Sequence, residues 1–511
     1  MSAGLRPHDT PLDGKLLRMF KVDPLLRQPL YSVEATRALE HAAAAGLPRH
    51  ALMQRAGLAV AQLALALAPH ARRIWIACGP GNNGGDGLEA AMHLQHWGKQ
   101  AVVTWLGSLE RAPQDAAASH QRAVAAGVSF AQTPPHDYDL CIDALLGQGA
   151  TDRAPDPRMA EWIERINSGS APVLAVDLPT GLLADTGALA AHSVRAQHTL
   201  SLLTLKPGLY TAHGRDATGN VWLDDLDIPR PSASGLGSLT PLAWLGGAPQ
   251  PGARPHASHK GSFGDVAVVG GAQGMTGAAL LAASAALHNG AGRVFVSLLD
   301  HDAVGVDTSQ PELMFRAPEA LDFKTMTVVC GCGGASAVAS VLHKILSTAA
   351  QLVLDADALN AIANDTQLQT LLVARGKRQT ATVLTPHPLE AARLLGSTAR
   401  AVQQQRLDCA EQLARRFGCT VVLKGSGSII AAPQQTTFIN PTGNARLATA
   451  GTGDVLAGMI GARLAGGQHA FEAAWHAVYL HGLAADQWPS TQPLTAQALA
   501  RGAPPWPQRL D

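Results

Sequence analysis

Short runs of apolar residues alternate along the chain with segments whose apolar residues recur at helical spacing. In the first half the runs are typical of buried strands, and they lie at 72–79, 101–107, 139–147 and 173–181. Between the first two runs, segment 88–98 has apolar residues at helical spacing, beginning with Leu88, Ala91 and Met92. Short apolar strands that alternate with helices predict a parallel sheet covered by helices on both faces.

The alternation stops between about 229 and 257, where Pro, Gly and Ser are frequent and no period is sustained. This composition is typical of a linker. The alternation then resumes with a helical segment at 277–292 and strand-like runs at 265–271, 327–333, 351–360, 380–387 and 420–427. The sequence therefore predicts an α/β protein with two domains, bounded as an N-terminal extension 1–29, a domain 30–230, a linker 231–255 and a domain 256–511.

Composition narrows the functional class. The 511 residues are 47% hydrophobic with a formal net charge of zero, and no basic patch of nucleic-acid size is visible. Electrostatic binding of DNA or RNA is therefore not expected. The first twenty residues lack an apolar core of signal-peptide length, and no run approaches a membrane span. These features predict a soluble protein of the cytoplasm.

The six cysteines do not form a disulfide framework in a chain of this length. Cys330 and Cys332 are the one close pair, and no second Cys/His pair stands beside them, so a metal site is not expected there. We expect all six to be small buried residues in a reducing compartment.

Candidate chemistry in the second half centres on the stretch ATAGTGDVLAG (448–458), where a helix is predicted to begin. Free N–H groups at a helix N-terminus favour an anion, and Gly451 and Gly453 leave room for a bulky one. Asp454 would repel a phosphate unless it had another task, such as accepting a proton from an attacking hydroxyl. The alternative is that Asp454 only caps the helix.

Four further motifs are predicted at strand ends, where open α/β sheets bind ligands. They are GGAQGMTGAA (270–279), LDADALN (354–360), LTPHPLE (384–390) and LKGSGS (423–428). Lys424 beside two glycines favours a phosphate contact, although a surface lysine at a hairpin would look the same. His387 stands between two prolines and could serve only as a structural hydrogen-bonding group. Asp355 and Asp357 could be helix caps or lie near magnesium, and neither is assigned to the catalytic set.

Together these motifs resemble the NAD(P)H-hydrate dehydratase domain of the ribokinase-like superfamily. The first half resembles the NAD(P)H-hydrate epimerase domain that is fused to it in bifunctional repair enzymes, so the resemblance covers residues 30 to 505. It implies a Rossmann-like α/β/α sandwich followed by a ribokinase-like α/β domain. The implied substrates are NADHX, NADPHX and ADP, with no nucleic-acid or membrane partner, and we expect self-association into a homo-oligomer.

The resemblance assigns roles in the second half. Asp454 would accept the hydroxyl proton of the (S) hydrate, and phosphate transferred from ADP would leave in place of hydroxide, giving AMP. A magnesium ion would assist. The implied hydrate-binding residues are Ala278, Gly333, His387 and Asp454. The implied nucleotide-binding residues are Lys424, Gly425, Ser426, Gly427, Ser428 and Gly453. The chain departs from the family at GCGGA (331–335), where Gly-Pro-Gly-Leu-Gly is usual, and at Leu389, where glycine is usual.

In the first half, CGPGNNGGDGLEAA (78–91) follows a strand and opens a helix. It lacks the Gly-Lys-Ser/Thr of a Walker loop and the usual setting of the dinucleotide fingerprint. Its amides could hold a pyrophosphate while oxygen atoms bind a hard cation. The alternative is a glycine-rich turn with an aspartate cap.

The epimerase resemblance implies that Asp177 is the acid/base for interconverting the R and S hydrates and that Lys206 assists it. An isolated surface lysine is the alternative for Lys206. The implied hydrate-binding residues are Asn82, Asn83, Gly84, Gly85, Asp86, Gly147, Gln148, Gly149, Ala150, Thr151, Asp152, Arg153 and Asp177. A potassium ion would be held by Asn83, Asp143 and Thr180, with Thr180 standing where the family usually has serine. GQG at 147–149 replaces the family's GTG.

Two other functions fit parts of the sequence. The second half could be a kinase that releases a stable phosphorylated alcohol of a vitamin pathway. The first half could be a noncatalytic nucleotide-binding or scaffold module. Recovery of NADH from its hydrate, and the response of the R hydrate to Asp177→Ala, distinguish these from a bifunctional repair enzyme.

Overall fold

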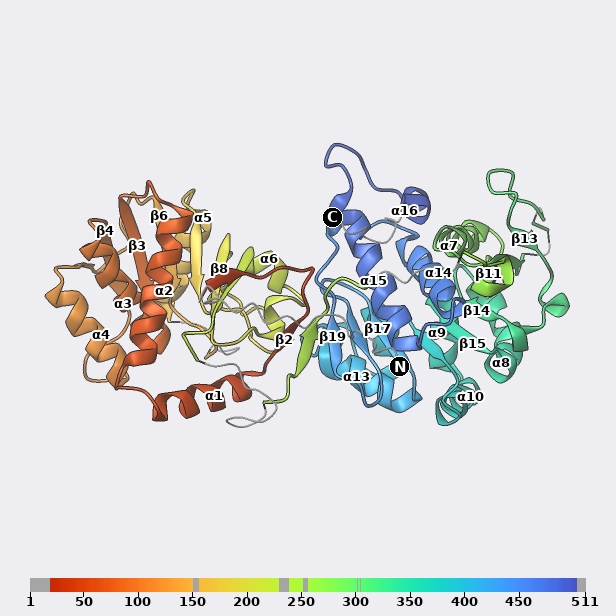
Figure 1. Ribbon diagram of the computed structural model, residues 1–511, viewed down its shortest axis with the longest axis horizontal. Helices are drawn as coiled ribbons and strands as arrows, with labels where there is room; N and C mark the ends of the chain where they lie inside the picture. The colour runs from red at the N-terminus through yellow and green to blue at the C-terminus, as the bar shows by residue number, and fades with distance from the viewer. Residues whose placement is uncertain are drawn as a thin grey trace, which may run out of the picture.

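The computed structural model describes residues 19–149, 156–228, 239–250, 256–300, 302–303 and 305–502. Two lobes lie side by side along the long axis of the molecule, and each is built around one sheet (Figure 1). The N-terminal lobe carries the red-to-yellow elements, and the C-terminal lobe carries the green-to-blue ones. This arrangement confirms the predicted α/β class with two domains.

The first sheet has the strand order β1-β9-β8-β7-β6-β3-β4-β5, and every neighbouring pair is parallel except β1 with β9. Its strands are β1 (Met19–Lys21), β3 (Arg73–Cys78), β4 (Gln100–Trp105), β5 (Ser129–Ala131), β6 (Leu140–Ala144), β7 (Val173–Val176), β8 (His198–Leu202) and β9 (Asn220–Asp224). Its helices are α1 (Val33–Ala45), α2 (Ala51–Leu67), α3 (Asn82–His96), α4 (Gln114–Ala125), α5 (Pro157–Ser168), η1 (Pro207–Leu209) and α6 (Gly214–Thr218). The central strands β6 and β7 are buried along their whole length, as expected for a sheet covered on both faces.

The second sheet has the order β13-β12-β11-β14-β15-β16-β17-β18-β19-β10-β2. It is parallel from β13 to β17, then continues through the antiparallel strands β18 and β19 to β10 and β2. Its strands are β2 (Gln28–Leu30), β10 (Ala243–Leu245), β11 (Asp265–Gly270), β12 (Arg293–Leu298), β13 (Met314–Phe315), β14 (Thr327–Cys330), β15 (Gln351–Leu354), β16 (Thr382–Leu384), β17 (Thr420–Leu423), β18 (Ile429–Ala431) and β19 (Thr437–Ile439).

Helices cover the second sheet, and α14 with α7 packs on the face that carries the Ala- and Val-rich part of the core. The helices are α7 (Thr276–His288), α8 (Ala339–Thr348), α9 (Ala356–Asn364), α10 (Thr366–Lys377), α11 (Pro388–Leu395), α12 (Ala399–Gln404), α13 (Arg406–Phe417), α14 (Thr452–Ala465), α15 (Ala470–Gln487) and α16 (Ala496–Gly502). Short 3₁₀ turns are η2 (Lys260–Phe263), η3 (Pro318–Ala320), η4 (Phe323–Thr325), η5 (Ala335–Val338) and η6 (Ala445–Leu447). Close packing is possible because Gly458 of α14 lies against the backbone of α7, where a Cβ would stand 2.0 Å from the Ala282 carbonyl oxygen.

Two segments that sequence patterning left outside the domains carry strands. The extension assigned to 1–29 contains β1 and most of β2, and the linker assigned to 231–255 contains β10. Both β2 and β10 belong to the second sheet. Run 351–360 is a strand only to Leu354, because α9 begins at Ala356.

One apolar cluster extends across both domains. Leu30 is fully buried in a cluster that joins Leu205 and Leu209 of the first domain to Ala243 and Leu245 of the second. The chain crosses between the sheets directly after β2, where the Tyr31 N–H donates to the Leu205 carbonyl at 2.8 Å. The domains are therefore packed together through buried hydrocarbon.

The cysteines largely match expectation, since five are buried, but Cys409 is only partly buried. All six are free thiols. Across the described ranges, no helix has the length and apolarity needed to cross a membrane.

Two candidate active sites

The first site is a cavity of about 620 Å³ at the carboxyl ends of β3, β6 and β7. Among the predicted hydrate-binding residues, those that line it are Asn82, Asn83, Asp86, Gly147, Gln148, Gly149 and Asp177. Ala150, Thr151, Asp152 and Arg153 lie outside the described residues. The cavity wall is completed by α1 and α2, which contribute Thr36, Arg37 and Glu40 among others.

The glycine-rich loop forms the first turn of α3, with Gly81 at the N-cap and Asn82 as the first helical residue. No side chain caps this helix end, so Asp86 does not act as its cap. Gly84 and Gly85 are buried and do not line the cavity. A Cβ on Gly84 would lie 2.0 Å from the Gly79 carbonyl oxygen, so this glycine lets α3 pack closely against the end of β3.

Asp177 and Lys206 form a buried ion pair at the base of the cavity. Lys206 Nζ lies 2.5 Å from Asp177 Oδ1, and the lysine is fully buried. The ammonium also donates to the Leu202 carbonyl at 2.9 Å, and the Gln148 N–H donates to Asp177 Oδ2 at 3.2 Å. Lys206 is therefore no surface lysine. Asp177 is held in place by partners on both oxygens, and its backbone adopts a left-handed φ of 63°.

Other acids face the same space. Burial raises the pKa of Asp86 well above its usual range, and the negative charges of Asp177 and Glu40 raise it further. Burial and Asp177 also raise the pKa of Glu40. Two carboxyl groups with raised pKa values, Asp86 and Glu40, therefore lie in the cavity with the Asp177–Lys206 pair, and groups of this kind are candidates for acid–base chemistry.

The predicted potassium ligands come from three places: Asp143 from β6, Thr180 from the segment after β7, and Asn83 from the first turn of α3. Asp143 is fully buried, and its Oδ1 accepts from the Thr180 hydroxyl at 2.7 Å while its Oδ2 accepts from the Thr180 N–H at 2.8 Å. Burial raises the pKa of Asp143 to about 6 against the effect of these hydrogen bonds. Asn83 Nδ2 is buried without a hydrogen-bond partner in the described part of the chain. Carboxylate, hydroxyl and amide oxygens are ligands that suit a hard cation, so the residues fit potassium.

The second site begins at the N-terminus of α14. Gly451 is the N-cap with φ 89°, and Asp454 lies in the first helical turn. Asp454 is therefore not the helix cap, which leaves its carboxylate free for other contacts. Lys424 lies over this helix end, since a Cβ on Gly453 would stand 3.3 Å from Lys424 Nζ.

Asp355 anchors Lys424 from the end of β15. Lys424 Nζ and the Thr385 hydroxyl each lie 2.7 Å from Asp355 Oδ1, and Asp355 is 1% exposed. Burial lowers the pKa of Lys424, but the charges of Asp355 and Glu390 outweigh it and leave that pKa raised. Lys424 is therefore a partly buried ammonium that Asp355 anchors at the N-terminus of α14. That is a favourable place for a phosphate.

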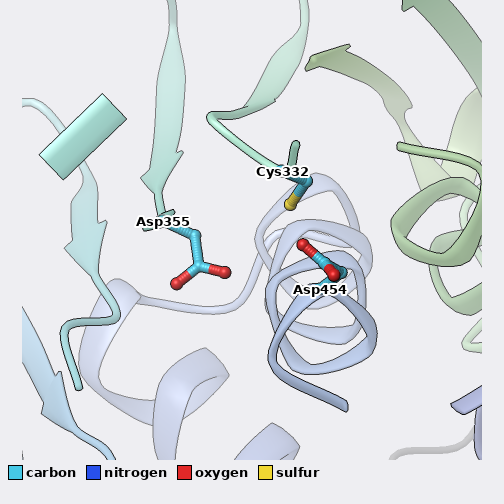
Figure 2. Close-up of side chains that lie close together, drawn as sticks. All are labelled: Cys332, Asp355 and Asp454. Atoms are coloured by element: carbon cyan, nitrogen blue, oxygen red, sulfur yellow. The ribbon is translucent and has the colours of Figure 1, made fainter. Parts of the chain in front are cut away.

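Cys332, Asp355 and Asp454 come together from three different elements (Figure 2). One ligand atom of each lies within 4.8 Å of the others. Burial raises the pKa of Asp454 to about 6, and the neighbouring Asp355 carboxylate adds to the shift. Asp454 can thus release and accept a proton close to neutral pH, as a general base needs to do.

His387 caps α11. Its Nδ1 accepts from the Leu389 N–H at 3.1 Å and the Glu390 N–H at 3.4 Å, and Glu390 Oε2 accepts from the His387 N–H at 2.8 Å. Burial and the Lys424 charge lower the pKa of His387. The ring is therefore neutral with its proton on Nε2, which lies 3.2 Å from Glu390 Oε1. His387 therefore serves as a structural hydrogen-bonding group, which is the alternative role that the sequence left open.

The remaining predicted hydrate contacts, Ala278 and Gly333, touch each other. Gly333 has φ 60°, and a Cβ there would lie 2.9 Å from the Ala278 Cβ. The Gly333 carbonyl accepts from the Ala272 N–H at 2.7 Å, which joins the loops after β11 and β14. The predicted nucleotide segment Lys424–Ser428 forms the turn between β17 and β18, next to Gly453.

Magnesium fits this site only in part. Carboxylate oxygens of Asp357 and Asp454 are ligands of the type it takes, and Asp357 Oδ2 already accepts from the Ala335 N–H at 2.8 Å. Asp355 is neutralised by Lys424, and the Cys332 thiol is too soft a ligand for magnesium. The phosphates of a nucleotide would have to supply the other ligands.

Sequence reasoning missed several residues of both sites. The sequence leaves Asp355 outside the catalytic set, as a helix cap or a residue near magnesium, and at the N-cap position of α9 its side chain makes no capping bond. Cys332 was read only as a buried thiol. Thr36, Arg37 and Glu40 come from a helix that carries no motif. Asp355 could have been recognised in the sequence because it follows a predicted strand directly, as the LTPH motif follows the next one. No sequence pattern marks the other residues.

Comparisons with known proteins agree with the two-domain architecture. Residues 49–208 match a family model described as YjeF-related protein N-terminus, and residues 266–503 match one described as NAD(P)H-hydrate dehydratase. The chain is 36% identical over 462 residues to the bifunctional NAD(P)H-hydrate repair enzyme Nnr of Escherichia coli K12, covering 86% of this chain and 85% of that protein. It is 34% identical over 471 residues to the Coxiella burnetii enzyme of the same name, covering 90% and 94%.

One solved structure similar to the second half is the ADP/ATP-dependent NAD(P)H-hydrate dehydratase of Bacillus subtilis, co-crystallised with ATP and Mg²⁺. It is 32% identical, covers 48% of this chain and 90% of its own, and has a TM-score of 0.42. The sequence matches extend across both domains, and each of the two sites lies within the domain that its family model matches. The chain belongs to the family of bifunctional NAD(P)H-hydrate repair enzymes.

Proposed function

We propose that the chain repairs hydrated NADH and NADPH by epimerising their R and S forms and by dehydrating the S form at the expense of ADP. The observation that carries the proposal is the convergence of Asp454 with the anchored Lys424 at the N-terminus of α14, in a chain of this family. A base and a phosphate-binding cation at one helix end are the parts that phosphoryl transfer to an alcohol needs.

In the second site, Asp454 accepts the proton of the hydrate hydroxyl as its oxygen attacks the terminal phosphorus of ADP, and AMP leaves. Lys424, Gly453 and the turn Gly425–Ser428 hold the phosphates, while Ala278, Gly333 and His387 contact the hydrate. The ring nitrogen then expels phosphate, which is a far better leaving group than hydroxide, and loss of the neighbouring ring proton restores the double bond. Magnesium bound with the nucleotide would supply charge stabilisation for the phosphates.

In the first site, Asp177 exchanges protons with the hydroxyl group of the hydrate as that group leaves and returns on the other face of the ring. Lys206 holds the Asp177 carboxylate in position. Asn82, Asn83, Asp86 and the segment 147–149 surround the hydrate. Asn83, Asp143 and Thr180 would hold a potassium ion, which would supply a fixed positive charge. A cytoplasmic location and self-association stay predictions from the sequence.

The experiment that tests this function supplies purified R and S hydrates of NADH with ADP, with ATP or with no nucleotide, and follows the absorbance of reduced nicotinamide. We expect NADH to reappear from both hydrates with a nucleotide and from neither without one. A stable phosphorylated product would instead favour the kinase alternative. Loss of the R hydrate no faster than its spontaneous epimerisation would favour the noncatalytic alternative for the first domain.

The dehydration rate should depend on the ionisation of Asp454. Its pKa is raised to about 6, so the carboxylate that accepts the proton predominates above that pH and is lost below it. We expect the rate at saturating substrates to fall by about tenfold for each pH unit below the pKa. A stopped-flow pH profile measures this, and a rate that stays level from about pH 7 to about pH 5 would contradict the role of Asp454 as base.

Removing the Thr180 hydroxyl should weaken potassium binding. Thr180→Val deletes a predicted ligand oxygen and the hydrogen bond that orients Asp143. Loss of such an interaction typically costs about tenfold or more in metal affinity, so half-maximal epimerisation should need about tenfold more potassium. Thr180→Ser keeps the hydroxyl and should match the parent. Identical potassium titrations for Thr180→Val and the parent would contradict the site.

A further inference from the structure

The predicted nucleotide-binding turn lies in the interface between the two domains. Directly after η1, Tyr210, Thr211 and Ala212 of the first domain run along the turn at 424–428. The Ala212 N–H donates to the Ser426 carbonyl at 3.2 Å, and the Thr211 hydroxyl donates to the Gly427 carbonyl at 3.2 Å. Gly427 has φ 59°, and a Cβ there would lie 2.0 Å from the Tyr210 carbonyl oxygen. The first domain therefore touches the backbone of the turn itself.

A buried arginine ties the two sides together. Arg406, at the start of α13, is 1% exposed, and its Nε donates to the Thr211 hydroxyl oxygen at 3.0 Å. Its Nη2 donates to the Leu423 carbonyl at 3.3 Å and to the Lys424 carbonyl at 3.2 Å. Thr211, which is fully buried, thus accepts from Arg406 and donates to the turn. We call Thr211, Ala212 and Arg406 the interdomain clamp.

The clamp fixes the direction of the amide groups in the turn. The peptide bonds of the turn 424–428 are trans, and in a trans peptide the C=O and the next N–H point in opposite directions. The clamp binds the carbonyls of Lys424, Ser426 and Gly427. The N–H groups of Gly425, Gly427 and Ser428 are therefore directed away from the clamp. Several N–H groups turned the same way form an anion-binding concavity.

We propose that the interdomain clamp is a positioning device for nucleotide binding, through which the epimerase domain holds the ADP-binding turn of the dehydratase domain in its binding conformation. This inference rests on the proposed nucleotide role of the turn. The residues of the clamp touch neither substrate nor the reacting atoms. The clamp makes ADP affinity in the second site depend on a hydroxyl that belongs to the first domain.

The test measures ADP affinity by calorimetry on the full chain, so that it does not depend on turnover. Thr211→Val keeps the shape and removes the hydroxyl, and we expect the Kd for ADP to rise about tenfold. Thr211→Ser restores a hydroxyl and should stay within about twofold of the parent. The matched control is Thr199→Val, which removes another buried hydroxyl of the same domain, bonded to the Thr218 carbonyl at 2.8 Å and away from the turn.

Thermal melting checks that each variant folds. Should Thr211→Val not fold, Arg406→Lys takes its place, because it keeps the charge but cannot reach Thr211 and two carbonyls at once, and it should weaken ADP binding to a similar extent. Unchanged ADP affinity in Thr211→Val or Arg406→Lys would overturn the proposal, as would a parent protein that does not bind ADP. A parent that binds ADP but restores no NADH would refute the proposed function alone, and the affinities would still decide on the clamp.

Discussion

Replacing Asp454 with asparagine should abolish ADP-dependent dehydration while leaving epimerisation at the parent rate. Asparagine has the same shape and keeps the first turn of α14 intact, but it cannot accept a proton from the hydrate hydroxyl. A positioned general base contributes about 10²–10⁴-fold, so the rate of NADH recovery from the S hydrate should fall by that range. The neighbouring Asp355 carboxylate is already engaged by Lys424 and Thr385, so we do not expect it to replace Asp454 as the base.

Two measurements make this prediction specific. The R-to-S interconversion, followed by chromatography of the two hydrates, should not change, because Asp177 lies in the other domain. The matched control is Asp365→Asn, which changes an aspartate that caps α10 into another good capping residue, and it should keep full activity. Dehydration within about threefold of the parent in Asp454→Asn would show that another group accepts the proton.

Replacing Asp177 with asparagine should have the opposite effect on the two activities. The carboxylate that exchanges protons with the hydrate is lost, so enzymatic epimerisation should fall by about 10²–10⁴-fold, while dehydration of pure S hydrate stays at the parent rate. A mixture of both hydrates would then be cleared in two phases, with the R hydrate limited by spontaneous epimerisation.

The same substitution should also destabilise the protein, because it leaves the fully buried Lys206 without its counter-charge. Breaking a buried pair from one side costs about 3–5 kcal/mol, measurable as a lower midpoint of urea unfolding. Asp139→Asn is the control, since Asp139 accepts from backbone N–H groups near the surface and asparagine retains an acceptor oxygen. Parent-like epimerisation in folded Asp177→Asn would remove Asp177 from the catalytic set.

The buried parallel strands of both sheets can be predicted from local sequence, but the short strands that depend on distant partners cannot. Runs such as 72–79 and 139–147 predict β3 and β6, because strands buried on both faces of a parallel sheet are continuous apolar stretches. The strands β2 and β10 were not recognised. Each is three residues long in a Pro- or Gly-rich setting, and each is ordered by pairing with a strand far away in sequence.

The residues of the two sites could also be predicted only where a local motif marks them. Glycine turns and strand-end acids located the neighbourhoods of Asp454, Asp177 and Lys424, since these motifs have a local mechanism. Whether a lysine is buried against an acid depends on tertiary packing. The partner of Lys206 is 29 residues away in sequence and the partner of Lys424 is 69 residues away, and no local pattern encodes either contact. The contact of the first domain with the turn 424–428 could not be predicted from the sequence for the same reason.

The most direct test of the account follows the hydroxyl oxygen of the hydrate. We would prepare S hydrate labelled with oxygen-18 at the ring hydroxyl, add ADP and the protein, and analyse the released phosphate by mass spectrometry. Transfer of the phosphoryl group to that hydroxyl, followed by its expulsion, predicts one labelled oxygen in each phosphate released with NADH. Unlabelled phosphate and labelled water would contradict the account, since the hydroxyl would then leave without ever having been phosphorylated.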